Sequence, residues 1–196
     1  MSNKAIKVAS LAVFALGILS RGKSASSRGS IYWQGGDYSN VPWQAVEFIG
    51  RCEGRLLTAY YDVYGWSIAY GNHYYPNGVK VKEGDRITES QAEDMLRHSI
   101  GRINKTLSER IPNWSSMNNS QRSAIISFAY NVGSGFYGSP NFEAITNALA
   151  NDWNAVPLAL EKYVMSGGKK LSGLVRRRKG EGRLWRGEWK SGDGCK

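Results

Sequence analysis

The segment EGRLLTAYYDVYGWSIAYGNH, residues 53–73, decides the fold of this chain. Its residues 56–70 are rich in aromatic and β-branched side chains, and Gly65 supplies a turn signal. This composition is typical of a β-hairpin, so the sequence predicts one here. Asp62 lies just before the turn, and eight residues separate it from Glu53. Taken alone, an Asp in this position would be interpreted as a residue that caps its own turn.

The residues before the hairpin predict an amphipathic helix. The pattern starts at Pro42, which suits the first turn of a helix, and stops at Gly54. A rotation of about 100° per residue places the apolar side chains on one side, and Glu53 projects from that side. A carboxyl group at the edge of an apolar face loses hydration, which favours its protonated form. Alone, Glu53 could equally reach water at the helix end, but a chain reversal can set it across a cleft from Asp62, as hydrolysis of a glycosidic bond requires.

The chain after the hairpin is predicted to be mainly helical. Thr88 and Gln91 form a capping box in front of apolar residues at helical spacing, namely Ala92, Met95, Leu96, Ile103 and Leu107. A second helix over residues 121–133 has the same periodicity and is expected at the centre of the core. These elements predict an α+β fold in which a small β-hairpin lobe packs on a larger helical lobe, with the active cleft between them.

The length of 196 residues allows one full hydrophobic core and leaves no room for a second sizeable domain. We expect a hydrophobic membrane-targeting segment at residues 1–20 and a Ser- and Gly-rich flexible linker at residues 21–38. One catalytic domain is expected at residues 39–190, followed by a tail at residues 191–196.

Residues 8–20 form an uncharged apolar run with basic residues on both sides. These 13 residues would span about 20 Å as a helix, which is short of a hydrocarbon core of about 30 Å. A signal-peptide core fits this length, but Arg21 and Lys23 stand where a cleavage region should be neutral. We expect a signal-anchor that is exported uncleaved, contacts the cytoplasmic membrane through residues 5–20 and can later leave it; a cleaved signal peptide is the alternative.

The chain carries 26 Lys and Arg against 16 Asp and Glu, a formal net charge of +10 that predicts attraction to polyanions. No recognised nucleic-acid-binding motif surrounds the basic residues, so no nucleic-acid partner is expected. The basic C-terminal stretch is interpreted as a solvated helix face; its residues are Arg176, Arg177, Arg178, Lys179, Arg183, Arg186 and Lys190.

Two cysteines, Cys52 and Cys195, are too few for a disulfide framework. No metal-ligand spacing such as CxxC or HExxH occurs in the sequence, so we expect neither a metal ion nor another cofactor. A single bridge between the two cysteines would join the C-terminal end to the first helix in an oxidising compartment. Two independent thiols are an equal alternative.

These motifs resemble the phage-type lysozymes or endolysins, family 24 of the glycoside hydrolases. Residues 53–73 resemble the family pattern of a Glu, an Asp after eight residues and a Thr in a TIGxG-like strand. The stretch QRSAIISFAYNVG, residues 121–133, resembles the family's central helix, and residues 167–181 resemble its terminal GGK…GLxxRRxxE pattern. Ser67 stands where Thr is usual, with four residues instead of five after Asp62. The resemblance covers about residues 40–186 and implies the lysozyme-like form of the α+β fold.

The resemblance also implies a reaction, the cleavage of the β-1,4 bond between N-acetylmuramic acid and N-acetylglucosamine in peptidoglycan. Glu53 would protonate the leaving oxygen, and Asp62 would stay ionised and either activate water or stabilise the oxocarbenium-like transition state. Ser67 would orient the attacking water. The outcome would be inversion or retention of the anomeric centre, depending on the distance between the carboxyl groups. We interpret His73 as a structural hydrogen-bond or ion-pair partner.

A phage lysis enzyme of this kind would be a monomer that is exported to the host periplasm and acts on peptidoglycan glycan strands. The alternative is a virion- or membrane-associated lysozyme-like component with reduced activity that opens the wall during entry, and the serine at position 67 is the feature that favours it. A basic nucleic-acid binder is a third hypothesis, supported by net charge alone.

Overall fold

The computed structural model describes residues 38–193 and residue 195. The membrane-targeting segment expected at residues 1–20 and the linker up to residue 37 lie outside the described residues. Within the described part of the chain, no helix is both long and apolar enough to cross a membrane.

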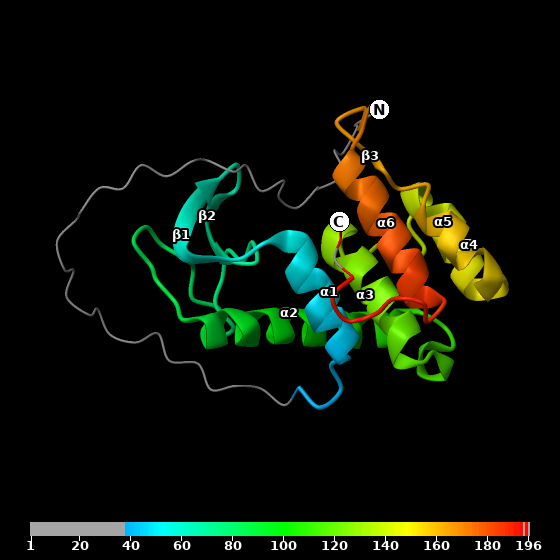
Figure 1. The fold of residues 1–196 in the computed structure, drawn as a ribbon, viewed down its shortest axis with the longest axis horizontal. Coiled ribbons are helices and arrows are strands. Elements are labelled where there is room, and N and C mark those ends of the chain that lie inside the picture. Colours follow the sequence, from blue (N-terminus) through cyan, green and yellow to red (C-terminus); the bar gives the residue numbers. More distant parts are fainter. Residues whose placement is uncertain (1–37, 194, 196) are drawn as a thin grey trace.

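The described chain forms a small β-hairpin lobe and a larger helical lobe, with one long helix running under both (Figure 1). The elements are α1 Trp43–Glu53, β1 Leu56–Asp62, β2 Gly65–Ala69, α2 Glu89–Arg110, α3 Asn119–Val132, α4 Glu143–Asn151, α5 Val156–Leu160, β3 Met165–Ser166, β4 Lys169–Lys170 and α6 Ser172–Trp185. Short 3-10 turns occur at Trp114–Ser116, Pro140–Phe142 and Trp153–Ala155. The predicted hairpin, the three predicted helices (α1, α2 and α3) and the α+β architecture are confirmed.

The hairpin and the helices begin where local sequence signals place them. Strands β1 and β2 pair in antiparallel fashion, with Asp62 opposite Gly65 on either side of a two-residue turn. The capping box before α2 is present, because the Thr88 hydroxyl accepts a hydrogen bond from the Gln91 amide at 3.2 Å and the Gln91 side chain accepts one from the Thr88 amide at 2.9 Å. Helix α1 ends at Glu53, and Gly54 follows with φ +69°, a conformation that favours glycine.

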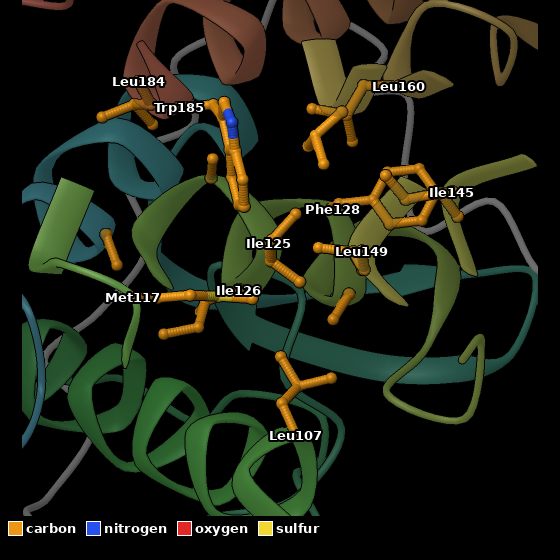
Figure 2. Close-up of a cluster of buried hydrophobic side chains, with 14 of the residues drawn as sticks. Leu107, Met117, Ile125, Ile126, Phe128, Ile145, Leu149, Leu160, Leu184 and Trp185 are labelled. Carbon is orange, nitrogen blue, oxygen red and sulfur yellow. The ribbon is translucent and has the colours of Figure 1, made fainter. Parts of the chain in front are cut away.

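Helix α3 lies at the centre of the helical lobe, as expected, and packs against α1, α2 and α6. Figure 2 shows Ile125, Ile126 and Phe128 of α3 among apolar side chains from the surrounding helices. Each of these three is fully buried, and such burial stabilises the fold by about 1.5–3 kcal/mol per side chain. The core therefore holds α1 and α6 on fixed sides of α3.

The hairpin lobe has a smaller core of its own. Ile68 of β2 and Met95 of α2 are buried together with Ala69, Tyr75, Val81 and Ala92. This cluster anchors the hairpin on the first half of α2, while the second half of the same helix reaches the core around α3. Helix α2 thus fixes the hairpin relative to the helical lobe.

The C-terminal segment folds back on α1. Trp189 is buried against Phe48, with ring centroids 5.8 Å apart, and the Ser191 hydroxyl and the Gly192 amide donate hydrogen bonds to Glu47 at 2.8 and 3.1 Å. Beyond this contact, Cys52 and Cys195 form a disulfide. Of the two alternatives for the cysteines, the structure shows the bridge.

Candidate active site

Glu53 is buried at the C-terminal end of α1 in an ion pair with α6. Its side chain is 3% exposed, and Arg177 Nη1 donates a hydrogen bond to Glu53 Oε1 at 2.5 Å. The pair joins two residues 124 positions apart in the sequence. The ion pair therefore sets the guanidinium group of α6 directly against the candidate acid at the end of α1.

Arg177 belongs to a buried network that also contains Arg178, Glu181 and Ser127. Arg177 Nε donates to Glu181 Oε1 at 3.2 Å, Arg178 Nη1 donates to Glu181 Oε2 at 2.8 Å, and Ser127 Oγ donates to Glu181 Oε1 at 2.8 Å. With Glu53 and Glu181 ionised, two carboxylates balance two guanidinium groups. Burial alone would lower the pKa of Arg177, but the adjacent carboxylates of Glu53 and Glu181 outweigh it and raise that pKa.

The network corrects the interpretation of the basic C-terminal stretch. Arg177 and Arg178 are 5% and 1% exposed, so the expected solvated helix face is wrong for these two residues. They lie inside because buried charges are tolerated when partners of opposite charge surround them, and Glu181 and Glu53 supply those partners.

Tyr130 of α3 is a neighbour of Glu53 that the sequence did not single out. Its hydroxyl donates a hydrogen bond to the Tyr70 carbonyl at 3.2 Å. Burial and the nearby charge of Glu53 raise the pKa of Tyr130 well above its usual range. A neutral phenol therefore stands beside the carboxylate.

Asp62 is held at the hairpin turn by two hydrogen-bond donors. Its Oδ1 accepts from the Tyr64 amide at 2.8 Å, which is the turn-capping role expected of an Asp in this position. Its Oδ2 accepts from the Ser67 hydroxyl at 2.7 Å. The Asp62 side chain is 20% exposed, so it reaches the surface while Ser67, at 0%, is fully buried.

The strand register explains how Ser67 reaches Asp62. Four residues separate the two, one fewer than in the sequence pattern that this segment resembles. Ser67 pairs with Tyr60, and Tyr60 lies two residues before Asp62 on β1. Side chains two residues apart in a strand share a face, and diagonal neighbours across two strands are within reach. The structure therefore brings Asp62 and Ser67 together, and it places Glu53 in the separate network with Arg177.

Comparison with known proteins gives the family. Residues 50–181 match the phage lysozyme family. The chain is 35% identical over 148 residues to an endolysin of Bacillus phage PZA, covering 71% of this chain and 52% of the relative. It is 30% identical over 151 residues to an endolysin of Acyrthosiphon pisum secondary endosymbiont phage 1, covering 74% of this chain and 97% of the relative. The chain thus spans about half the length of the Bacillus phage relative and nearly all of the other.

A solved structure agrees with these relatives. The endolysin from Escherichia coli O157:H7 phage FAHEc1 superposes with a TM-score of 0.62 at 26% identity, covering 74% of this chain and 92% of that protein. The likeness confirms the lysozyme-like form of the α+β fold. The chain belongs to the phage lysozyme family.

Proposed function

We propose that this protein is a muramidase that cleaves the β-1,4 bond between N-acetylmuramic acid and N-acetylglucosamine in peptidoglycan. Family membership and the endolysin relatives support a lysozyme-type glycoside hydrolase. The observation that carries the assignment of roles is the contrast between two carboxylates: Glu53 is 3% exposed and Asp62 is 20% exposed. Carboxyl groups in unlike environments can act as acid and base in one reaction.

Glu53 is the proposed general acid. Its proton passes to the glycosidic oxygen as the bond to the anomeric carbon breaks, and the carboxylate that remains is the form that Arg177 binds. Arg177 therefore stabilises the product of the proton transfer. As a general acid, Glu53 must carry this proton in the substrate complex before it donates it.

Asp62 is the proposed base or charge stabiliser. The Tyr64 amide and the Ser67 hydroxyl both donate to it, so each of its oxygens is held by one hydrogen bond. The carboxylate then activates water or stabilises the oxocarbenium-like transition state. Because Ser67 is fully buried, we assign it to positioning Asp62, through which it acts on the water.

Ser67 bears on the alternative of a weakly active virion component. That alternative drew on the replacement of threonine by serine, yet the serine hydroxyl makes the hydrogen bond to Asp62. This contact supports an enzyme with hydrolytic activity over a component with reduced activity.

Replacement of Glu53 by Gln is the direct test of the acid. The change keeps the shape of the side chain and removes the transferable proton, so we expect turnover of purified peptidoglycan to fall by about 100-fold or more. For the parent protein, mass spectrometry of the fragments released from peptidoglycan should show N-acetylmuramic acid at the new reducing end. Asp62→Asn should be similarly severe, and Ser67→Ala milder.

The matched control is Glu188→Gln, because Glu188 forms an exposed ion pair with Arg186. It should leave turnover unchanged. Activity of Glu53→Gln within tenfold of the parent would assign the acid to another residue.

We also propose that residues 1–20 carry the domain to or across the cytoplasmic membrane uncleaved. The disulfide supports this destination, since such bonds persist in oxidising compartments and are rare in the cytosol. Fractionation of expressing cells, followed by alkylation of free thiols and intact mass measurement, should find the whole chain with its disulfide in membrane and periplasmic fractions. A chain that starts near Ser26 would indicate an ordinary signal peptide, and a reduced chain confined to the cytoplasm would contradict export.

A further inference from the structure

His73 is the third member of a chain of hydrogen bonds that ends on Asp62. Its Nδ1 lies 3.0 Å from Ser67 Oγ and 3.2 Å from the Trp66 carbonyl oxygen. Its Nε2 lies 3.9 Å from Asp62 Oδ2. The histidine side chain is 31% exposed, so it covers one side of the buried serine and also faces solvent.

The direction of each hydrogen bond follows from the groups involved. An ionised Asp62 can only accept, so the single hydroxyl hydrogen of Ser67 is used on Asp62 Oδ2. The Trp66 carbonyl oxygen can also only accept. Nδ1 of His73 lies within hydrogen-bond distance of both this oxygen and the Ser67 oxygen. Because both neighbours of Nδ1 act as acceptors, we infer that the hydrogen is on Nδ1.

We propose that His73 is a positioning residue for the reaction proposed above: its Nδ1–H donates to Ser67 and so directs the serine hydroxyl to Asp62. This inference rests on the proposed muramidase function. Without the histidine, the Ser67 oxygen loses the donor at Nδ1, and a rotation of the serine side chain would take away one of the two donors of Asp62. The carboxylate would then be less well oriented when water attacks.

A positioning role should separate turnover from binding. In His73→Ala we expect kcat on soluble peptidoglycan oligosaccharides to fall by about 10- to 100-fold with KM changed little, because only the orientation of the base is lost. His73→Asn places an amide N–H close to the position of Nδ1 and should restore most of kcat. His73→Gln places its amide nearer to Nε2 and should not.

The other histidine of the chain supplies the control. His98 lies on α2, outside this hydrogen-bond chain, and His98→Asn should leave kcat and KM unchanged. Loss of activity in His73→Asn equal to that in His73→Ala, with both variants folded, would overturn the proposal, because a donor at Nδ1 would then not suffice.

A measurement that needs no activity separates this inference from the proposed function. Nitrogen-15 NMR of the imidazole rings in the full-length protein, above the pH at which histidine is protonated, should show the Nδ1–H tautomer for His73. Ser67→Ala should alter the His73 signals and leave those of His98 in place. The Nε2–H tautomer in the parent protein would overturn the hydrogen-bond chain whether or not the protein cuts peptidoglycan. An inactive parent with the Nδ1–H tautomer would instead count against the muramidase.

Discussion

Glu181 holds two arginines inside the helical lobe. Arg177, Arg178 and Glu181 fall at the same helical spacing as Leu174 and Leu184, and all five are buried. The sequence therefore contained a sign of their burial, because charged residues that continue an apolar stripe must be paired inside. Arg177 also has Glu53 as a buried partner, however, and no local sequence pattern predicts a contact between residues 124 positions apart.

The charge balance of this network makes a prediction about Glu181. Glu181→Gln removes one of two negative charges and leaves two buried guanidinium groups with Glu53 alone. Removal of one partner from a buried ion pair costs about 3–5 kcal/mol, so we expect a loss of this size in the free energy of unfolding, measured by urea denaturation. Glu188→Gln, which breaks an exposed pair, should cost less than about 1 kcal/mol. Equal losses in the two variants would contradict the importance of the network.

At the level of single residues, motif spacing predicted Glu53, Asp62 and Ser67 as the candidates, and the hydrogen bond between Asp62 and Ser67 agrees with a shared site. The partners Arg177 and Tyr130 were not expected as neighbours of Glu53. Their proximity is a property of how α1, α3 and α6 pack, which residue spacing within each helix does not determine.

The elements that the sequence predicted are those whose signals are local. The hairpin turn, the capping box before α2 and the glycine after α1 each depend on neighbouring residues, and each is present. Strands β3 and β4 were not expected. They have two residues each, too few for a periodic pattern to show.

The approach of α1 to α6 depends on Gly180, which faces Phe48. A Cβ atom at this glycine would lie 2.7 Å from the Phe48 ring, closer than carbon atoms normally approach. Gly180→Ala should therefore destabilise the protein by about 1–3 kcal/mol, despite the better helix propensity of alanine. It should also lower turnover, because the same two helices carry Glu53 and Arg177.

The control for Gly180→Ala lies on the same helix. A Cβ atom at Gly173 would meet nothing within 4 Å, so Gly173→Ala should be neutral or slightly stabilising. Thermal unfolding and peptidoglycan turnover of the two variants give the comparison. If Gly180→Ala is as stable as Gly173→Ala, the two helices have more freedom than their packing indicates.

In the molecule as a whole, three connections hold the described parts in place. Helix α2 links the two lobes, the ion pair of Glu53 with Arg177 links α1 to α6, and the C-terminal segment returns to α1. The disulfide that closes this third connection was one of two alternatives at the level of sequence. Two cysteines 143 residues apart in the sequence carry no information about how far apart they lie in the fold. The structure sets their Cα atoms 5.1 Å apart, within the usual range for a disulfide.

The disulfide makes the last prediction. A bridge across a sequence separation of 143 residues restricts the unfolded chain, and its loss should lower the free energy of unfolding by about 2–5 kcal/mol. Cys195→Ser should show this loss in urea denaturation without reductant, whereas Trp189 and the hydrogen bonds to Glu47 should still hold part of the C-terminal segment. The parent protein in excess reductant should match Cys195→Ser, and the variant should not respond to reductant because it has no bridge to lose. If full reduction leaves the stability of the parent unchanged, the contacts of Trp189 and Glu47 alone secure the segment, and the disulfide adds nothing to the fold.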